Sequence, residues 1–220
     1  MTRSLIIGGT GGIGTALTQN LQAKGHAVTT LSRRADGLDF DDPARAADKL
    51  ADLEGPFDMI LVATGALTVT RTRPEKSLTE LTAEELAAQF AVNTIGPALV
   101  MREARRLLPR KGRSVFAALS ARVGSIGDNR LGGWYSYRAS KAALNQIVHT
   151  GAIELARSHK EAICVVLHPG TVATEFTENY SAAPKISPEQ SAQHLTEVLD
   201  GLTPAQSGQF FDWKGTQVDW

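Results

Sequence analysis

Tyr137 and Lys141 are the residues whose types and spacing indicate chemistry most directly, in the segment Tyr137-Arg138-Ala139-Ser140-Lys141. Four residues make about one turn of an α-helix, so the two side chains would share one face. A phenol has a pKa of about 10, and a neighbouring ammonium group lowers it by stabilising the phenolate. The spacing predicts that Tyr137 is a general acid assisted by Lys141, whereas Tyr135 has only an alanine four residues later. Because ordinary amphipathic helices show the same spacing, the prediction depends on the surrounding elements.

A glycine-rich segment, Gly8-Gly9-Thr10-Gly11-Gly12-Ile13-Gly14, holds five glycines in seven residues between an apolar run and a helical pattern. Glycine adopts positive φ in tight turns and lets a phosphate approach the backbone. The helix that follows would present free N–H groups and the positive end of its dipole. The segment predicts a pyrophosphate cradle for a dinucleotide, with contacts expected at Gly8, Thr10, Gly11, Gly12, Ile13 and Gly14.

The segment Ser32-Arg33-Arg34 follows this loop by about 20 residues, where dinucleotide-binding α/β folds contact the adenosine ribose. An acidic residue there selects NAD, and an arginine accommodates the 2′-phosphate of NADP. Two guanidinium groups beside a hydroxyl suit a dianionic phosphate, because they form bidentate, charge-assisted bonds. We therefore predict NADP(H), bound by Ser32, Arg33 and Arg34. Two alternatives stay open: the arginines are solvated surface charges, or Asp36 binds the ribose.

Short apolar runs that alternate with helix-like stretches must position these residues. The clearest strands are Ser4–Ile7, His26–Leu31, Met59–Ala63, Ser114–Leu119 and Ala162–Leu167, with a seventh strand expected near Gly208–Phe211. Their nearly continuous apolar character predicts helices on both faces of the sheet. Apolar spacing predicts helices over 13–23 and 84–108, the second with Thr82 as its N-cap and a glutamate at the third helical position. We predict an α/β fold, a Rossmann-type, doubly wound parallel sheet of about seven strands, in a single domain over residues 1–220.

The composition excludes several classes of function. The 220 residues hold 23 Lys and Arg against 23 Asp and Glu, so no excess positive charge would attract nucleic acid or anionic lipid. The one cysteine, Cys164, cannot form an internal disulfide, and the histidines lack metal-ligand spacing. The N-terminal apolar run is too short for a signal peptide or a membrane span. We expect a cytoplasmic protein with no bound metal, no nucleic-acid partner and no membrane association.

Together with the segments Ser120–Ser125 and Gly132–Arg138, these motifs resemble the short-chain dehydrogenase/reductase family over essentially the whole chain. The resemblance is strongest to the branch with sniffer-type carbonyl reductases and bacterial C-factor-like proteins. It implies hydride transfer between NADP(H) and a small-molecule carbonyl or alcohol substrate, by a homodimer or homotetramer. In this family pattern Tyr137 is the general acid of carbonyl reduction. Lys141 holds the nicotinamide ribose and lowers the tyrosine pKa, and Asn93 anchors a proton-relay water.

Other segments resemble cofactor contacts of the family. Asp39-Phe40 is similar to a pair that holds the adenine, and Val62-Ala63-Thr64-Gly65 retains the glycine of an N-N-A-G motif. His168–Thr174 resembles a P-G-x-V-x-T motif that meets the nicotinamide carboxamide and the pyrophosphate. A substrate loop over 175–186 would follow, with an apolar pocket lined by Phe176, Tyr180 and Trp134. The resemblance thus adds the cofactor contacts Asp39, Phe40, Gly65, Asn93, Pro169, Gly170, Val172 and Thr174.

Two departures from the family pattern affect these predictions. The asparagine of the N-N-A-G motif is absent, which would weaken cofactor affinity. The family's catalytic serine, three residues before Gly124, is replaced by Ala121. Losing one donor to a developing oxyanion costs about 10²–10³ in rate. Ser120 is the substitute we favour, and Ser125 is the alternative. The missing hydroxyl also supports a second hypothesis, a dinucleotide-binding sensor or signalling protein with little turnover.

Overall fold

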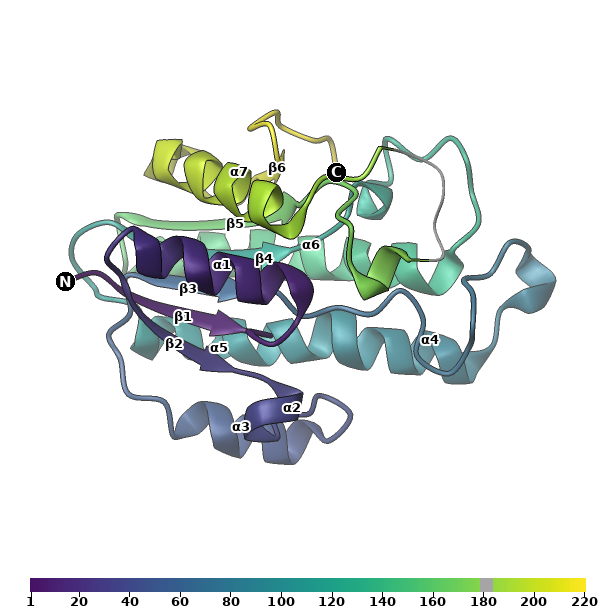
Figure 1. Cartoon of the computed structure of the whole chain (residues 1–220), viewed down its shortest axis with the longest axis horizontal. Helices are drawn as coiled ribbons and strands as arrows, with labels where there is room; N and C mark the ends of the chain where they lie inside the picture. The colour runs from purple at the N-terminus through teal and green to yellow at the C-terminus, as the bar shows by residue number, and fades with distance from the viewer. Residues whose placement is uncertain (179–183) are drawn as a thin grey trace.

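The protein, described from a computed structural model that covers residues 1–178 and 184–220, is built around a parallel β-sheet (Figure 1). The strands are β1 (Arg3–Ile7), β2 (Ala27–Leu31), β3 (Met59–Val62), β4 (Ser114–Leu119), β5 (Ala162–His168) and β6 (Phe210–Asp212). The described residues form a six-stranded sheet in the order β2-β1-β3-β4-β5-β6, with every pair parallel. The predicted fold class is confirmed, and the strand expected near residues 208–211 is the sixth of the sheet.

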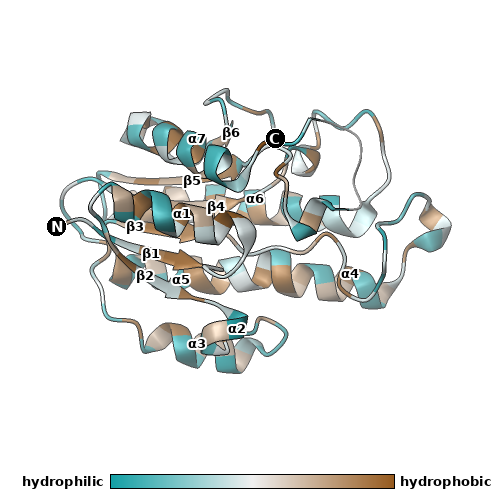
Figure 2. Ribbon diagram, in the orientation of Figure 1, coloured by the Kyte–Doolittle hydropathy of each residue, from teal (hydrophilic) through white to brown (hydrophobic). Residues whose placement is uncertain are grey.

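Helices cover both faces of this sheet, as Figure 1 shows. One face carries α1 (Gly12–Ala23) and α7 (Pro188–Gly201), and the other carries α3 (Pro43–Ala51), α5 (Gly96–Leu107) and α6 (Tyr135–Leu155). Successive residues of a strand point to opposite faces, so Leu5 and Ile7 join the core beneath α5 and α6 while Ile6 joins the core beneath α1 and α7. In Figure 2 the strands are mainly hydrophobic, and α5 and α7 alternate between hydrophobic and hydrophilic residues.

The long helix expected over 84–108 contains a π-helical segment. Helix α4 (Ala83–Phe90) runs into a π-helical turn at Ala91–Ile95 and continues as α5. Thr82 caps α4 as predicted, because its hydroxyl accepts the Glu85 N–H at 3.3 Å. The Glu85 carboxylate does not complete a capping box, since it accepts hydrogen bonds from residues 69 and 70 instead. Single π-turns inside helices are frequent at functional sites, and this one carries Asn93.

Three helices, α2 (Arg33–Asp36), α3 and α7, lie between predicted strands, where the sequence predicted helical connections without fixing their bounds. Helix α7 begins with a capping box between Ser187 and Gln190 and has a proline in its first turn. Helix α3 begins with Asp42 as its cap and also has a proline in the first turn. Both starts follow known sequence preferences of helix N-termini, so the signal was present in the sequence.

The strand order brings the loops that follow the strands to one edge of the sheet. The order reverses beside β1, which pairs with β2 on one side and β3 on the other. Open α/β sheets bind ligands at such a switch point, outside the carboxyl ends of the strands. The glycine loop follows β1, Thr64 and Gly65 follow β3, Ser120 follows β4 and Pro169 follows β5. Among the described residues, no helix combines the length and apolar character needed to cross a membrane.

Candidate active site

The glycine loop between β1 and α1 can adopt its tight packing only because side chains are absent. Gly8 has a φ of +91°, and a Cβ atom on Gly14 would lie 2.1 Å from the Gly8 carbonyl oxygen. A Cβ atom on Gly12 would lie 2.6 Å from Cγ2 of Thr174, so the segment after β5 abuts the start of α1. Gly11 caps α1 without a side-chain hydrogen bond, and the first turn has no acidic residue. This geometry, with free N–H groups at a helix start, fits a dinucleotide pyrophosphate.

The two arginines of the predicted 2′-phosphate site lie in the short helix α2. Ser32 caps this helix, and its hydroxyl accepts the Ala35 N–H at 3.2 Å. The Arg33 and Arg34 side chains are exposed, and their guanidinium groups form no hydrogen bond or ion pair with the described residues. The carboxylate of Asp36 accepts the Ser32 N–H at 2.8 Å and the Ser32 hydroxyl at 3.2 Å. Asp36 therefore holds the cap in place, which leaves the arginines as the groups open to a ligand.

The segment predicted to hold the adenine lies beside α5. The Phe40 ring is buried and packs on Gly96, where a Cβ atom would lie 2.2 Å from the ring. Asp39 is half-buried, and its carboxylate accepts the Asp41 N–H at 3.1 Å. Phe40 thus anchors the segment to α5 by its side chain.

The end of β3 meets the start of α6 at Gly65. A Cβ atom on Gly65 would lie 3.3 Å from both Oδ1 of Asn93 and Nζ of Lys141. The structure therefore brings together three predicted residues from three different elements. Next to them, Oγ1 of Thr64 is buried and has no hydrogen-bond partner in the part of the chain that the structure describes. An unpaired buried hydroxyl beside the glycine loop is consistent with a site that binds a polar ligand.

Tyr137 and Lys141 lie one turn apart on α6 and are both buried, as the spacing predicted. Nζ of Lys141 donates to the Leu119 carbonyl at 2.9 Å and lies 5.9 Å from the centroid of the Tyr137 ring. Burial lowers the pKa of Lys141 to about 7 and raises the pKa of Tyr137 above its ordinary value. The expected lowering of the tyrosine pKa by an ammonium group is therefore not seen, because burial acts on both groups. A phenol that keeps its proton at neutral pH suits a general acid.

Asn93 occupies the π-helical turn and bonds to the backbone that follows Gly65. Its Oδ1 accepts the Ala66 N–H at 2.9 Å, and its Nδ2 donates to the Ala66 carbonyl at 2.9 Å. The same Nδ2 donates to Oγ of Ser140 at 3.2 Å. The side chain is fully buried. Asn93 thus joins the end of β3, the middle of the α4–α5 helix and the start of α6.

The serines near Ala121 are engaged elsewhere in the structure. The Ser120 hydroxyl donates to Oδ1 of Asn145 at 2.6 Å, and Asn145 follows Tyr137 by two helical turns. The Ser125 hydroxyl accepts the Asp128 N–H at 3.0 Å. Ala121 itself is buried, with 9% of its surface exposed. That Ser120 supplies the missing hydroxyl stays a prediction, and its bond to Asn145 argues for a structural role.

The segment after β5 and two aromatic rings are the remaining predicted parts of the site at the carboxyl ends of the strands. Ala173 and Ile186 pair through a backbone hydrogen bond of 2.9 Å, and the Pro169 carbonyl accepts the Ser191 hydroxyl at 2.9 Å. Gly170 has a φ of +84°. The Tyr137 ring lies 6.2 Å from the Trp134 ring and 6.0 Å from the Phe176 ring, between centroids. Two of the three predicted aromatic residues thus lie beside Tyr137, and Tyr180 lies outside the described residues.

Comparison with known proteins identifies the family. A family model described as Enoyl-(Acyl carrier protein) reductase matches residues 8–200, which is most of the chain. The chain belongs to the short-chain dehydrogenase/reductase family. This is a family of oxidoreductases, and the predicted resemblance is confirmed.

Several members of the short-chain dehydrogenase/reductase family are similar to this chain. The 1-hydroxy-2-glutathionyl-2-methyl-3-butene dehydrogenase of Rhodococcus sp. is 41% identical over 134 residues, which cover 60% of this chain but only 57% of that protein. C-signal of Myxococcus xanthus is 39% identical over 62% of this chain and 79% of its own length. Carbonyl reductase Sniffer of D. melanogaster shares the fold with a TM-score of 0.80 and 23% identity, and each chain is covered fully. Other structures with this fold are described as bound to NADP or NADPH.

Sequence reasoning missed the polar residues that support this short-chain dehydrogenase/reductase site. Glu85 and Gln89 form a buried row with Asn93, and Ser140 and Asn145 receive hydrogen bonds from the predicted residues. Glu85, Gln89 and Asn93 are spaced by four residues, so their shared helix face was readable from the sequence. The partners at the two ends of the row were not, because they come from other segments, the loop at residues 66–70 and helix α6.

The lowered pKa of Lys141 predicts how the stability of this protein, without bound cofactor, depends on pH. Between pH 7 and the ordinary value of 10.5, the unfolded chain binds one more proton at Lys141 than the folded protein does. Lys141 alone therefore makes stability rise with pH there, by up to about 1.4 kcal/mol per unit. The buried Cys164 thiol has a raised pKa and acts in the opposite direction from about pH 8.5, where the unfolded thiol ionises, but this effect is the same in a variant of Lys141. Methionine has no amine to deprotonate on burial, so we expect Lys141→Met to be more stable than the wild type at pH 7. The difference in unfolding free energy between the two proteins should shrink from pH 7 to 9. Urea unfolding of both proteins at each pH measures the difference, and parallel pH profiles would contradict the prediction.

Proposed function

We propose that the protein is an NADP(H)-dependent oxidoreductase that reduces the carbonyl group of a small molecule, with Tyr137 as the general acid. The observation that carries the proposal is the convergence of Tyr137, Lys141, Asn93 and Gly65 beside the glycine loop. The buried Tyr137 ring lies 5.9 Å from Nζ of Lys141, and Lys141 in turn lies beside Gly65 at the end of β3. The similarity to carbonyl reductases supports the same reaction class.

Different residues of the chain have different roles in the proposed reduction. NADPH, when bound, supplies the hydride that adds to the carbonyl carbon. Tyr137 delivers its phenolic proton to the carbonyl oxygen, and burial favours the protonated phenol that this step needs. Lys141 would bind the nicotinamide ribose. The rings of Trp134 and Phe176 flank Tyr137 and would exclude water from the reacting carbonyl.

The proposal is tested by measuring NADPH oxidation by the purified protein with a panel of aldehydes, ketones and quinones. We expect oxidation that depends on the substrate and on the protein for at least one class of carbonyl. If NADPH binds, as measured by its fluorescence, but no member of the panel is reduced, the reductase proposal fails. If NADPH does not bind at all, the assignment of the cofactor fails as well.

Arg33 and Arg34 carry the proposed choice of NADPH over NADH. Loss of one charge-assisted hydrogen bond costs about 1.5–3 kcal/mol, so Arg33→Ala should weaken NADPH binding by about 10-fold or more. NADH binding should hardly change, because NADH lacks the 2′-phosphate. Arg105→Ala on α5 is the control, since this exposed arginine lies away from the carboxyl ends of the strands. An unchanged ratio of the two dissociation constants in Arg33→Ala and Arg34→Ala would contradict the preference.

A second candidate is a dinucleotide-binding signalling protein with little turnover. It is favoured by one observation, the absence of a hydroxyl at Ala121 combined with the engagement of Ser120 by Asn145. The similarity to C-signal is consistent with it. Tight NADPH binding without turnover across the carbonyl panel would favour this candidate. Assembly as a homodimer or homotetramer stays a prediction for either candidate, to be measured by light scattering.

A further inference from the structure

A row of three buried polar side chains runs along one face of α4 and the π-helical turn. Glu85 is 1% exposed, and Gln89 and Asn93 are fully buried. Nε2 of Gln89 donates to Oε1 of Glu85 at 2.9 Å, and Nδ2 of Asn93 donates to Oε1 of Gln89. The spacing of four residues places each side chain one turn above the last. Hydrogen bonds thus connect the row from one end to the other.

The row connects the loop after β3 with the backbone of Tyr137. At one end, the Glu85 carboxylate accepts the N–H groups of Val69 at 3.0 Å and Thr70 at 2.7 Å, and the Thr70 hydroxyl at 2.7 Å. At the other end, Asn93 donates to the Ser140 hydroxyl, which itself donates to the Tyr137 carbonyl at 2.9 Å. An acid at the far end of α4 is therefore linked to the residue proposed to transfer the proton.

The chemistry of the row fixes the orientation of both amides. An ionised carboxylate only accepts hydrogen bonds, so Gln89 must turn its NH₂ group toward Glu85 and its oxygen toward Asn93. Asn93 must then turn its NH₂ group toward Gln89, Ser140 and the Ala66 carbonyl, three acceptors that share two hydrogens, and Oδ1 accepts the Ala66 N–H. Burial raises the pKa of the Glu85 carboxyl, but its hydrogen bonds from Gln89, Thr70 and Val69 together lower it below the ordinary value. The charge that orients the row therefore persists at neutral pH.

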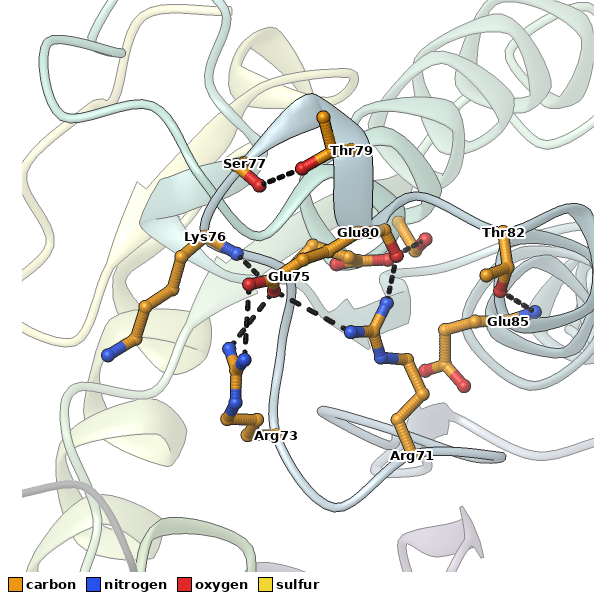
Figure 3. Close-up of polar contacts among 10 residues, drawn as sticks. Arg71, Arg73, Glu75, Lys76, Ser77, Thr79, Glu80, Thr82 and Glu85 are labelled. Carbon is orange, nitrogen blue, oxygen red and sulfur yellow. Dashed lines mark hydrogen bonds and ion pairs between the residues drawn. The ribbon is translucent and has the colours of Figure 1, made fainter.

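The Glu85 carboxylate orients the row and does not cap the helix in which it lies. It stands at the third position of α4, where a capping box would use its carboxylate on the Thr82 backbone. Figure 3 shows the Thr82 hydroxyl against the Glu85 nitrogen, with the carboxylate turned away. The carboxylate thus binds the loop at residues 69 and 70 and the Gln89 amide, and does not cap the start of its own helix.

Other contacts hold the same loop in place without Glu85. Glu80 accepts hydrogen bonds from the Arg73 guanidinium and the Lys76 N–H at 3.0 Å each, and Arg71 lies against it (Figure 3). The Glu75 carboxylate accepts the Ser136 hydroxyl, and the Glu75 carbonyl accepts the Trp134 N–H at 2.5 Å. A change at Glu85 should therefore disturb the row while the loop stays attached to α6.

We propose that Glu85 and Gln89 are positioning residues, which orient the Asn93 amide and through it set the backbone at Ala66 and Tyr137. The activity readout rests on the proposed carbonyl reduction. Neither residue touches the glycine loop or the exposed arginines in the structure, so their effect should appear in the chemical step rather than in NADPH affinity.

The test compares Glu85→Gln with two matched variants. Glu85→Gln keeps the shape but places an NH₂ group against N–H donors, and we expect kcat to fall by about 10²-fold, as small misplacements in an active site can cause. The dissociation constant of NADPH should change little. Glu84→Gln, an exposed neighbour, should behave like the wild type. In the double variant Glu85→Gln with Gln89→Glu, the amide donates to the new carboxylate and Asn93 keeps its acceptor, so most of the lost kcat should return.

Hydrogen exchange of residues 66–70 supplies a readout that does not need turnover. We expect faster exchange in Glu85→Gln and restored protection in the double variant. If the wild type reduces no carbonyl but exchange follows this pattern, the proposed function fails and the orientation of the row stands. If the double variant regains thermal stability without regaining kcat or protection, Glu85 is only a structural residue and the positioning proposal is overturned. A kcat in Glu85→Gln equal to the wild type would overturn it too.

Discussion

Replacing Tyr137 with phenylalanine should lower kcat for NADPH-dependent carbonyl reduction by about 10²–10⁴-fold, the range contributed by a positioned general acid. The substitution removes the phenolic O–H and keeps the ring, whose contacts with Trp134 and Phe176 would persist. Burial raises the pKa of the phenol, so the wild-type residue carries the transferable proton at neutral pH. NADPH binding should be nearly unchanged, because the glycine loop and the exposed arginines are not altered. Steady-state kinetics with the best carbonyl of the panel, beside NADPH fluorescence titration, measure both quantities.

Tyr135→Phe is the matched control for this variant. Tyr135 begins the same helix, is half-buried, and loses the same hydroxyl group. It has no lysine one turn later, so its kcat should equal that of the wild type. A Tyr137→Phe protein that keeps its turnover, or a Tyr135→Phe protein that loses it, would show that the proton comes from another group.

The parts of the site that could be predicted from sequence are those in which one short segment carries its own geometry. The Gly8–Gly14 loop is an example, since contacts within the segment forbid side chains and the helix follows at once. The pair Tyr137 and Lys141 is another, because helix spacing alone places both on one face. The apolar strands predicted the doubly wound sheet for the same local reason, and the sheet order then brings the segments together.

What the sequence could not predict depends on pairs of segments or on burial. The π-helical turn at Asn93 interrupts a helix whose apolar pattern is continuous. Glu85 is in the position of a helix cap, and only the folded loop at residues 69 and 70 shows that its carboxylate binds elsewhere. The direction of the Tyr137 pKa shift also depends on burial, which raises the pKa, whereas the spacing to Lys141 led us to expect a lower one.

Introducing a hydroxyl at Ala121 should raise kcat/KM for carbonyl reduction by about 10²–10³-fold, the effect of one donor to a developing oxyanion. The backbone at Ala121 is extended, with φ −143° and ψ 145°, so its side chain points away from that of Ser120. The Ser120 hydroxyl already donates to Asn145. Serine adds one oxygen to alanine, and the cooperative unfolding of Ala121→Ser should therefore stay close to that of the wild type.

The kinetics of Ala121→Ser distinguish three cases. The protein is an enzyme that lacks a hydroxyl donor to the oxyanion, an enzyme in which another hydroxyl is that donor, or a protein without turnover. Ala139→Ser is the control, because it adds a hydroxyl on an exposed part of α6. No gain in Ala121→Ser, with turnover already present in the wild type, would contradict the prediction and mean that another hydroxyl serves. A loss of kcat in Ser120→Ala or Ser125→Ala would then identify which one. No turnover in either protein, with NADPH bound to both, would instead favour the signalling candidate, since a restored donor cannot accelerate a reaction that the site does not perform.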